Sequence, residues 1–584
     1  MRAASARLLG CVWAALLTMS TLAAAQQYEG VAPIRPPSRP ASALPSLPLP
    51  PPDQSERIAI AVLHGLEFVA TDSTAGESAT MKIAHGSIFS IGAPALDEGF
   101  LRRFDADLGK PVTFGRLADI RAAVVKRFRA AGEPLVDVYL PEQDVTAGIV
   151  RIAVVKFRVG NVVAQGNRHF SDALLTGEMP LRHGALIRDT DVALGLALLN
   201  ANPYRRVDVV YTPGTAPNTT DIVLQTEDRL PLRVSAGYDN AGVPQLGRDR
   251  FFAGVDYGNL FGLDHDIAWQ TTVSNDFFRG NPPIEGRPNR PRFVAHAFSY
   301  AAPLPWFDRV ELFGLFAQST PRLPDSYSQS GISAQLSFRY DWLLPAVAGW
   351  QQQVQFGYDF KRSNNDLEFG GMQVFGSNTH THQVVLAWHA TRTDSYGQAD
   401  ANVTLVTSPG HLDADNEPAA YNAVRMGASP RYAYAKISGQ RVVTIGRGFS
   451  LSARGLFQWT GNTLLPAEEI GLGGDSSVRG YEPYAVQGDR GWNVQTELRA
   501  PSLVLGNSGI VLQAFMFVDA GHVWNRSDQP TENGNAALAS IGAGVRFELE
   551  RFISIRATFG QPLKAATPHT SKAPLAQIFV VVGN

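Results

Sequence analysis

The amino-acid sequence predicts a transmembrane antiparallel β-barrel of about sixteen strands, preceded by two small α+β domains. Three observations lead to this prediction. The chain begins with a segment typical of export signals, a helix–strand pattern then occurs twice, and the C-terminal part alternates apolar and polar residues in one segment after another. This order of features indicates a protein of a bacterial outer membrane.

The first residues are predicted to form a secretory signal peptide that spans residues 1–25. Two arginines precede an apolar run, and the run ends in the three small residues Ala23–Ala25, which suit signal-peptide cleavage. The run is shorter than the ~20 apolar residues of a membrane-spanning helix, so an anchor helix is disfavoured. Cys11, the only cysteine, lies in this segment. The mature chain therefore offers no thiol for disulfides, metal ligation or catalysis.

Residues 26–56 are predicted to be a proline-rich linker. Prolines are so frequent between Pro33 and Pro52 that a helix or a regular strand cannot form there. Such segments favour the extended polyproline II conformation and act as semi-rigid spacers. A recognition segment is the alternative interpretation.

Two small α+β domains are predicted at residues 57–156 and 157–229. In each domain, apolar residues at helical spacing precede a strand that begins with the letters VDV, at Val136 in the first domain and at Val207 in the second. The repetition indicates two copies of one module in tandem. The apolar helix faces comprise Leu117, Ile120, Val124 and Phe128 in the first domain, and Val192, Leu196 and Leu199 in the second.

Residues 230–584 are predicted to form the barrel. The alternation of apolar and polar residues recurs about sixteen times, and no helical segment is expected between the strands. Strands of ~10 residues that close into an even-numbered barrel leave no unpaired edge in lipid. The predicted strands begin near Leu232, Phe251, Ile267, Phe293, Val310, Ile332, Gln353, Gln383, Ala399, Tyr432, Leu451, Trp492, Val511, Ala539, Ile553 and Gln577.

The strand near Val511 indicates where one unusual carboxylate points. Alternate residues from Ile510 to Val518 form an unbroken apolar face, so Asp519 is predicted to point into the lumen together with Phe515 and Phe517. A carboxylate beside aromatic rings in a barrel favours a cationic partner, and arginine offers a planar, two-pronged donor.

A glycine-rich, charged segment between two strands predicts a loop that folds back into a protected place. It reads IGLGGDSSVRGY from Ile470 to Tyr481, and GDRG follows from Gly488 to Gly491. At these residues the sequence resembles the two-partner secretion transporters, which are the hemolysin and filamentous-hemagglutinin secretion-activation proteins of the barrel-assembly superfamily. The residues 259–264, NLFGLD, and 517–521, FVDAG, are similar to an early turn and a late strand of the same family.

The resemblance implies a set of site residues. The loop motif would be Val478, Arg479, Gly480 and Tyr481, and the partner strand motif would be Phe517, Asp519 and Gly521. It further implies that Arg479 lies inside the barrel and pairs with Asp519. The two α+β domains would correspond to the polypeptide-transport-associated (POTRA) domains of the family, POTRA 1 at 57–156 and POTRA 2 at 157–229.

The family implies an outer-membrane transporter that captures an unfolded partner protein in the periplasm and secretes it through its barrel. Capture would proceed by addition of an extended client segment to a sheet edge of the POTRA domains. The expected partners are a secreted client, such as a large β-helical exoprotein, the lipid of the outer membrane, and the barrel-assembly machinery. No cofactor and no metal are expected, and a net charge of -2 favours no nucleic-acid partner.

Two features depart from the family pattern. Some members begin with a helix that plugs the pore, whereas residues 26–52 are too proline-rich for a helix. Family barrels usually end on an aromatic residue, whereas Phe579 is here followed by five further residues.

Two other functions compete with secretion. A barrel-assembly factor would share the VRGY-type loop, but such proteins typically carry more POTRA domains than two. A diffusion porin would need neither these domains nor the loop. An enzyme is disfavoured, because the chain contains no serine elbow, no HExxH helix and no complete dinucleotide-binding loop.

Overall fold

The computed structural model describes two compact units, residues 37–230 and residues 1–36 with 231–584. The described residues are 31–34, 45, 47–49, 53–70, 82–279, 291–321, 327–369, 372–506, 508–526, 535–550, 552–566 and 572–584. The predicted signal peptide lies outside them. In this described part of the chain, no helix is long and apolar enough to cross a membrane.

The first α+β domain contains a five-stranded sheet in the order β3-β4-β2-β7-β6 and a two-stranded sheet, β1-β5. The predicted apolar face lies on the long helix α3, and its four residues are buried against the sheet. The helix ends before Gly132, whose positive φ of 83° favours glycine. The elements are β1 (Ile58–Ile60), β2 (Gly65–Ala70), β3 (Lys82–His85), β4 (Ile88–Ile91), α2 (Glu98–Leu101), η2 (Arg102–Asp107), β5 (Val112–Thr113), α3 (Phe114–Ala130), β6 (Val136–Tyr139) and β7 (Ile149–Lys156).

The second α+β domain contains a three-stranded sheet in the order β8-β10-β9. Its predicted apolar face lies on α5, where Val192, Leu196 and Leu199 are buried. The repeat that the sequence predicts therefore covers the helix and the strand after it, while the two described sheets differ in size. The elements are β8 (Arg158–Gln165), α4 (Asp172–Gly177), α5 (Asp189–Leu199), β9 (Arg205–Pro213) and β10 (Thr219–Asp228).

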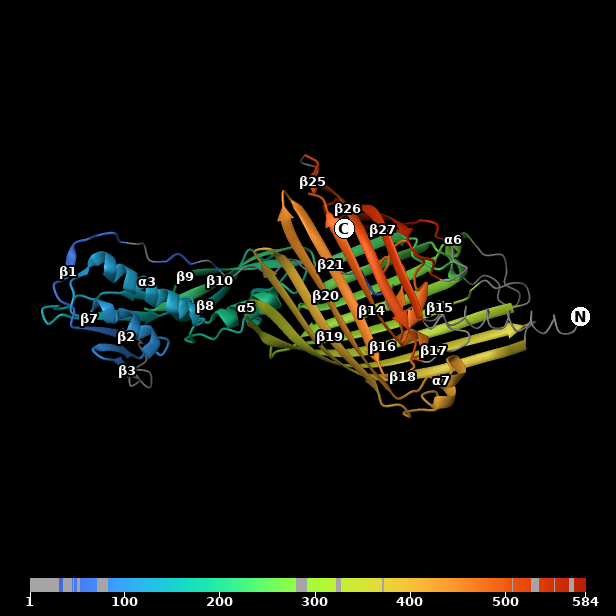
Figure 1. The fold of residues 1–584 in the computed structure, drawn as a ribbon, viewed down its shortest axis with the longest axis horizontal. Coiled ribbons are helices and arrows are strands. Elements are labelled where there is room, and N and C mark those ends of the chain that lie inside the picture. The colour runs from blue at the N-terminus through green and yellow to red at the C-terminus, as the bar shows by residue number, and fades with distance from the viewer. Residues whose placement is uncertain are drawn as a thin grey trace, which may run out of the picture. The chain divides into compact units, whose positions relative to one another are not determined.

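The second unit is a closed antiparallel barrel of sixteen long strands, with the two-residue strand β25 (Leu503–Val504) beside β26. Each of the sixteen predicted starting points falls in a different strand, so the predicted barrel is confirmed (Figure 1). The strands are β11 (Leu232–Asp239), β12 (Arg250–Leu260), β13 (His265–Ser274), β14 (Phe293–Pro303), β15 (Arg309–Ser319), β16 (Tyr327–Val347), β17 (Trp350–Phe369), β18 (Met372–Asp394), β19 (Gly397–Ser408), β20 (Tyr432–Gly446), β21 (Phe449–Thr460), β24 (Arg490–Arg499), β26 (Ile510–Trp524), β27 (Asn535–Leu549), β28 (Ile553–Pro562) and β29 (Leu575–Gly583).

Three strands are much longer than predicted. β16, β17 and β18 contain 21, 20 and 23 residues, and β18 begins at Met372 rather than near Gln383. Part of the added length is polar on both faces, as in residues 362–365 of β17, which read RSNN. A strand that extends beyond the lipid has water on both sides, so it loses the alternation from which its length was predicted.

The prediction that no helical segment separates the strands was wrong. Two short helices, α6 (Asp276–Arg279) and α7 (Pro418–Val424), and two single turns, η3 (Pro244–Leu246) and η4 (Pro466–Glu468), lie in the connections. Elements of three to seven residues are too short to show a helical period. The proline that begins α7 is favourable in the first turn of a helix, where its missing N–H has no partner to lose.

Part of the proline-rich segment lies in the barrel lumen. Val31 is buried against lumen-facing side chains of β14 and β15, including Phe293 and Leu315. The backbone N–H of Ile34 donates to Oε1 of Gln270 at 3.1 Å. Residues 31–34 are not helical. The remaining residues on which a plug helix would depend, 26–30 and 35–44, lie outside the described residues.

The barrel closes between its first and last strands. β11 pairs with β29 over five residues, from Ser235 opposite Gly583 to Asp239 opposite Phe579. The Phe579 ring stacks on Phe252 with 5.8 Å between centroids. This last aromatic residue of the chain therefore belongs to the contact that closes the barrel.

Candidate functional site in the barrel lumen

The connection between β21 and β24, residues 461–489, folds back into the lumen and is called the signature loop below. Its two legs pair as β22 (Ile470–Leu472) and β23 (Val486–Gly488). Loop residues and residues of β26 and β27 share one buried apolar cluster: Ile470, Leu472, Val478, Tyr481, Val486, Val523, Ala536 and Leu538. The structure thus buries this glycine-rich segment against β26 and β27.

Arg479 and Asp519 form a two-pronged ion pair inside the barrel. The Arg479 Nε and Nη2 atoms donate to the two Asp519 carboxylate oxygens, each at 2.7 Å. The Arg479 backbone N–H donates to Oδ2 of the same carboxylate at 3.1 Å. Asp519 is completely buried and Arg479 is 3% exposed. The structure thus brings together the two residues whose contact the sequence predicts.

Aromatic rings enclose the guanidinium of Arg479. It lies over the ring of Phe517 at 3.8 Å from the centroid and also faces Phe515 at 6.0 Å. Both rings are buried, while Met516 and Val518 of the same strand are 60% and 55% exposed on the outer face. A cation over the face of a desolvated ring gains electrostatic energy, so the rings stabilise the seated arginine as well as shielding it.

Glu497 on β24 completes the ion network, and the sequence reasoning did not single it out. The Arg479 Nη1 atom donates to Glu497 Oε1 at 2.5 Å. The other oxygen of Glu497 accepts from Arg546 at 2.8 Å and from Arg499 at 2.9 Å. Glu497 lies on the polar face of β24 together with Arg499, and only the closed barrel shows which of these charges reaches Arg479.

Gly480 and Tyr481 hold the backbone of the loop against the barrel wall. A Cβ atom on Gly560 of β28 would lie 2.6 Å from Gly480 Cα, and Gly480 itself has a φ of 88°. These two positions therefore require glycine. The Tyr481 hydroxyl lies 2.8 Å from the carbonyl oxygens of both Ala539 and Lys564, so one of them accepts its proton.

Gly521, the last residue of the strand motif, makes room for the loop. A Cβ at this position would lie 2.9 Å from Cδ1 of Leu472, which is fully buried. The strand motif therefore contributes an ion-pair partner at Asp519, a ring at Phe517 and an empty space at Gly521. All three serve to seat the same loop.

The tip of the loop is anchored to three strands, β21, β24 and β28. Arg556 of β28 forms an ion pair with Asp475. Gln495 of β24 donates to the Asp475 carbonyl at 3.1 Å, and Arg454 of β21 donates to the Ser476 carbonyl at 3.0 Å. The site is thus an arrangement that holds a loop in place. Within the described ranges, no group of three or more metal-ligating side chains is placed to hold a metal ion.

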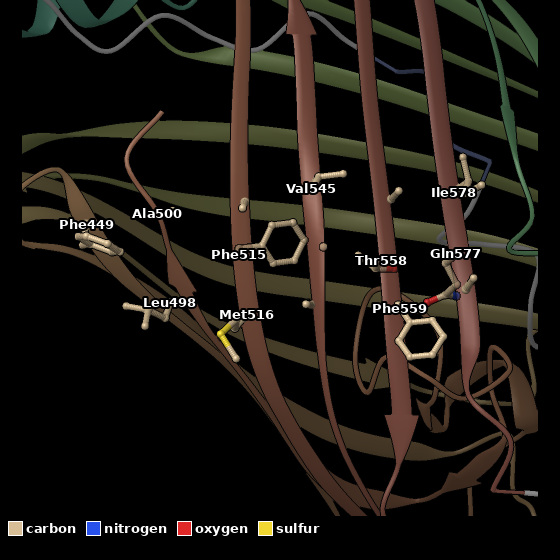
Figure 2. A pocket seen from close by; sticks show the side chains of 15 residues that line it. Phe449, Leu498, Ala500, Phe515, Met516, Val545, Thr558, Phe559, Gln577 and Ile578 are labelled. Carbon is tan, nitrogen blue, oxygen red and sulfur yellow. The ribbon is translucent and has the colours of Figure 1, made fainter. Parts of the chain in front are cut away.

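A hollow of about 640 Å³ lies in the wall formed by β21 and β24 to β29 (Figure 2). Six of its lining side chains are large, apolar and exposed on the outer face of the barrel: Phe449, Leu498, Met516, Val545, Phe559 and Ile578. Small residues such as Ala543 and Gly544 leave the gap between them. The hollow therefore belongs to the lipid-facing surface and not to the lumen site.

Comparison with known proteins supports the same reading. The family model for haemolysin secretion/activation proteins (ShlB/FhaC/HecB) matches residues 218–547, and the model for the ShlB-type POTRA domain matches residues 88–156. The outer membrane transporter CdiB of Dickeya dadantii is 22% identical, over 73% of each chain. The heme/hemopexin transporter HuxB of Haemophilus influenzae is 22% identical, over 78% of this chain and 79% of its own.

The fold of a solved relative is also similar. The structure of CdiB from Escherichia coli matches with a TM-score of 0.73 and 17% identity, and the match covers 94% of each chain. At this level of identity the match shows the fold alone, which is POTRA domains followed by a β-barrel.

The fold and the lumen site define an outer-membrane β-barrel transporter with periplasmic POTRA domains. The family model covers more than half of the chain, and the chain belongs to the haemolysin secretion/activation protein family, the transporters of two-partner secretion. The barrel accordingly lies in the bacterial outer membrane, and the domains before it lie in the periplasm.

Proposed function

We propose that this protein captures an unfolded partner protein in the periplasm and secretes it through its barrel, without catalysing a chemical reaction. The observation that carries the proposal is the signature loop, which Arg479, Asp519 and Glu497 seat inside the lumen. A loop held by a buried, removable ion network can leave space in the lumen when the network opens. A general diffusion pore would not need this arrangement.

Capture would use the free edge of a sheet in the POTRA domains, because backbone hydrogen bonds accept many client sequences. In the second domain β9 is an edge strand, and its one neighbour in the sheet is β10. On this edge the Asn200 side chain accepts a hydrogen bond from the Val207 N–H and donates one to the Val207 carbonyl. Residues 208–213 of β9 lie beyond these two hydrogen bonds, and they are the proposed place for an added client strand.

The proposal includes the partners and the domain limits. The client would be a secreted exoprotein, such as a large β-helical protein, and its folding outside would drive transport. Lipid and the barrel-assembly machinery would be needed for insertion, whereas cofactors and nucleic acid have no role. The signal peptide would be 1–25, the linker 26–56, POTRA 1 57–156, POTRA 2 157–229 and the barrel 230–584.

Barrel assembly is the second candidate function, since its factors share the VRGY-type loop. The family match and the presence of two POTRA domains favour secretion. A porin is the weakest candidate, because the loop and its anchors would then have no purpose.

The first test removes the ion network one partner at a time and measures secreted client per inserted transporter. Arg479→Ala leaves the fully buried Asp519 without its cation. This change should lower the free energy that favours the inward position of the signature loop by about 3–5 kcal/mol. Asp519→Ala should cost less, because Arg479 retains Glu497. The double variant should lose less than the sum of the single losses, since the second change removes the stranded charge. Arg479→Lys should restore secretion only in part.

The control for this test is Arg441→Ala. Arg441 pairs with Asp394 on β20 and β18 of the same barrel, and both side chains are partly exposed, 34% and 23%. Its secretion should stay near the wild-type level. Full secretion by Arg479→Ala, in a barrel that still migrates differently before and after boiling, would show that the loop does not carry the function.

A second test separates capture from passage. Deletion of residues 57–228 should leave an inserted barrel that conducts ions and secretes nothing, because the client has lost its periplasmic binding surface. Conductance across a planar bilayer reports on the barrel, and client in the medium reports on capture. Normal secretion from the truncated protein would remove the POTRA domains from the mechanism.

A further inference from the structure

The connection between β19 and β20, residues 409–431, is fastened to the signature loop by a second buried ion pair. Arg425 follows α7 and is 5% exposed, and its Nη1 atom donates to Asp489 Oδ1 at 2.6 Å. The same atom lies 3.0 Å from Glu469 Oε1 and donates to the Leu464 carbonyl at 2.7 Å. Residues 409–431 are called the strap below. This ion pair is separate from the Arg479 network.

Asp489 ties the two legs of the signature loop together where they leave the barrel wall. It is completely buried and follows directly after β23, in the GDRG segment. Its Oδ1 atom also accepts from the Leu464 N–H of the first leg at 2.7 Å, and Oδ2 accepts from the Arg526 N–H at 2.8 Å. One carboxylate therefore holds the strap, both legs of the loop and the connection after β26.

Apolar packing adds to this fastening. Tyr421 of α7 and Ala428 share a buried cluster with Leu464 and Leu465 of the signature loop. The Tyr421 hydroxyl donates to the His380 carbonyl of β18 at 2.9 Å, and Figure 1 shows α7 in orange beside this strand. The strap is therefore packed against the first leg of the loop on one side and against the barrel wall on the other.

The other end of the strap is pinned to β18. Asp413 Oδ2 lies 2.9 Å from His380 Nδ1 and 2.9 Å from His382 Nε2. The Asn416 side chain donates to the His380 carbonyl at 2.8 Å. The POTRA domains precede β11, so β11 runs outward from the periplasm. Neighbouring strands are antiparallel, and β19 and β21 therefore run outward as well. The strap and the stem of the signature loop consequently meet at the extracellular mouth.

We propose that the strap is a latch, in which Arg425 is a positioning residue that holds the outer legs of the signature loop at the mouth of the pore. Release of Arg425 from Asp489 precedes movement of the loop, while the Arg479 network stays intact at depth. The inference rests on the proposed function in one respect, since it is the passing client that requires this release. The latch itself is a property of the barrel and can be measured without a client.

The first experiment records the conductance of the purified protein in a planar bilayer. In Arg425→Gln the completely buried Asp489 and the Glu469 side chain, which is 7% exposed, lose the Arg425 charge, so the loop legs favour a hydrated, released position. We expect the fraction of time in the open state to rise about tenfold, which corresponds to about 1.4 kcal/mol. Arg425→Gln with Asp489→Asn should open less often than Arg425→Gln alone.

Arg431→Gln is the matched control. It makes the same chemical change at the exposed end of the same strap, where the Arg431 side chain donates to the Pro409 carbonyl at 3.3 Å. Its open fraction should equal that of the wild type. Equal open fractions in Arg425→Gln and Arg431→Gln, with both barrels showing heat-modifiable migration, would overturn the latch.

The second experiment locks the strap to the loop and does not depend on how Arg425→Gln folds. A Cβ on Gly427 would lie 3.9 Å from Thr463 Oγ1, so Gly427→Cys with Thr463→Cys places two thiols in reach of each other. Gly427→Cys alone controls for the strain of a side chain at a φ of 81°. The oxidised pair should be closed in the bilayer and should secrete nothing, and reduction should restore both.

The results distinguish this inference from the proposed function. If conductance depends on oxidation but no client is secreted in either state, the latch stands and secretion fails. If oxidised and reduced proteins conduct and secrete alike, the strap does not move and the inference is wrong.

Discussion

The POTRA domains and the barrel place their polar and apolar residues in opposite ways. In the first domain Phe68, Ile120 and Phe128 are completely buried, as in any water-soluble protein. In the barrel Asp519 is completely buried, whereas Met516 on the same strand is 60% exposed to the outer face. The domains are stabilised by apolar burial away from water, and the barrel by a closed set of backbone hydrogen bonds in lipid.

The two regions also use buried ion pairs differently. In the second POTRA domain, the fully buried Arg205 donates to Glu178 at 2.6 Å and to the Leu199 carbonyl at 2.6 Å. This pair joins helix and strand within one small core. The pair of Arg479 and Asp519 instead joins a loop to a wall that is already closed. One kind of contact can therefore stabilise the fold in one region and hold a removable loop in the other.

The largest expected difference concerns these two arginines. Arg205→Ala should destabilise the second POTRA domain by about 3 kcal/mol, because it leaves Glu178, whose side chain is 12% exposed, without its cation. Arg479→Ala should leave the barrel wall intact. Limited proteolysis of the full chain should therefore cut the domain in the first variant, and heat-modifiable migration should persist in both. Loss of the barrel in Arg479→Ala would break the comparison.

Truncation of apolar side chains should show the next largest difference. Ile120→Ala removes atoms from a fully buried position and should cost about 2–5 kcal/mol of domain stability. Met516→Ala removes atoms that face lipid, where no water is excluded, and should leave the temperature of barrel unfolding nearly unchanged. Thermal scans that resolve the two transitions measure both effects. An equal loss of stability in the two variants would contradict the opposite placement of apolar residues in the POTRA domains and in the barrel.

A methyl group on the barrel wall should displace the loop without opening the wall. Gly560→Ala places a Cβ 2.6 Å from Gly480 Cα. It should destabilise the inward position of the loop by about 1–3 kcal/mol. Gly455→Ala on β21 is the matched control, since its nearest neighbour would be the Asn493 carbonyl oxygen at 3.6 Å. Protease access to the loop from outside should rise in the first variant alone. Equal access in both would mean that the close approach does not matter.

The smallest predicted effect is confined to a helix cap. Thr113 accepts the Arg116 N–H at 3.1 Å and begins α3. Thr113→Ala should lower the stability of the first POTRA domain by about 1 kcal/mol. Barrel unfolding and bilayer conductance should not change. A shift of the barrel transition in this variant would show that the two regions unfold together.

The alternation in the sequence predicts about sixteen strands and the faces that they present, and the resemblance to the family implies the pairing of Arg479 with Asp519. Each of these follows from local pattern or from a motif: alternation with a period of two assigns a face, and the unbroken apolar row from Ile510 to Val518 leaves Asp519 in the lumen. The apolar faces of α3 and α5 could be predicted for the same reason, because apolar residues on one helix face recur every three to four positions.

Only the tertiary structure decided which lumen residues meet. Arg425 and Asp489 are 64 positions apart, and Arg546 reaches Glu497 across 49. No local period relates such residues, because closure of the barrel and the inward fold of one loop bring them together. The length of β16 to β18 was equally hidden, since strands with water on both faces carry no alternation. Local chemistry orients a side chain, and the closed wall selects its partner.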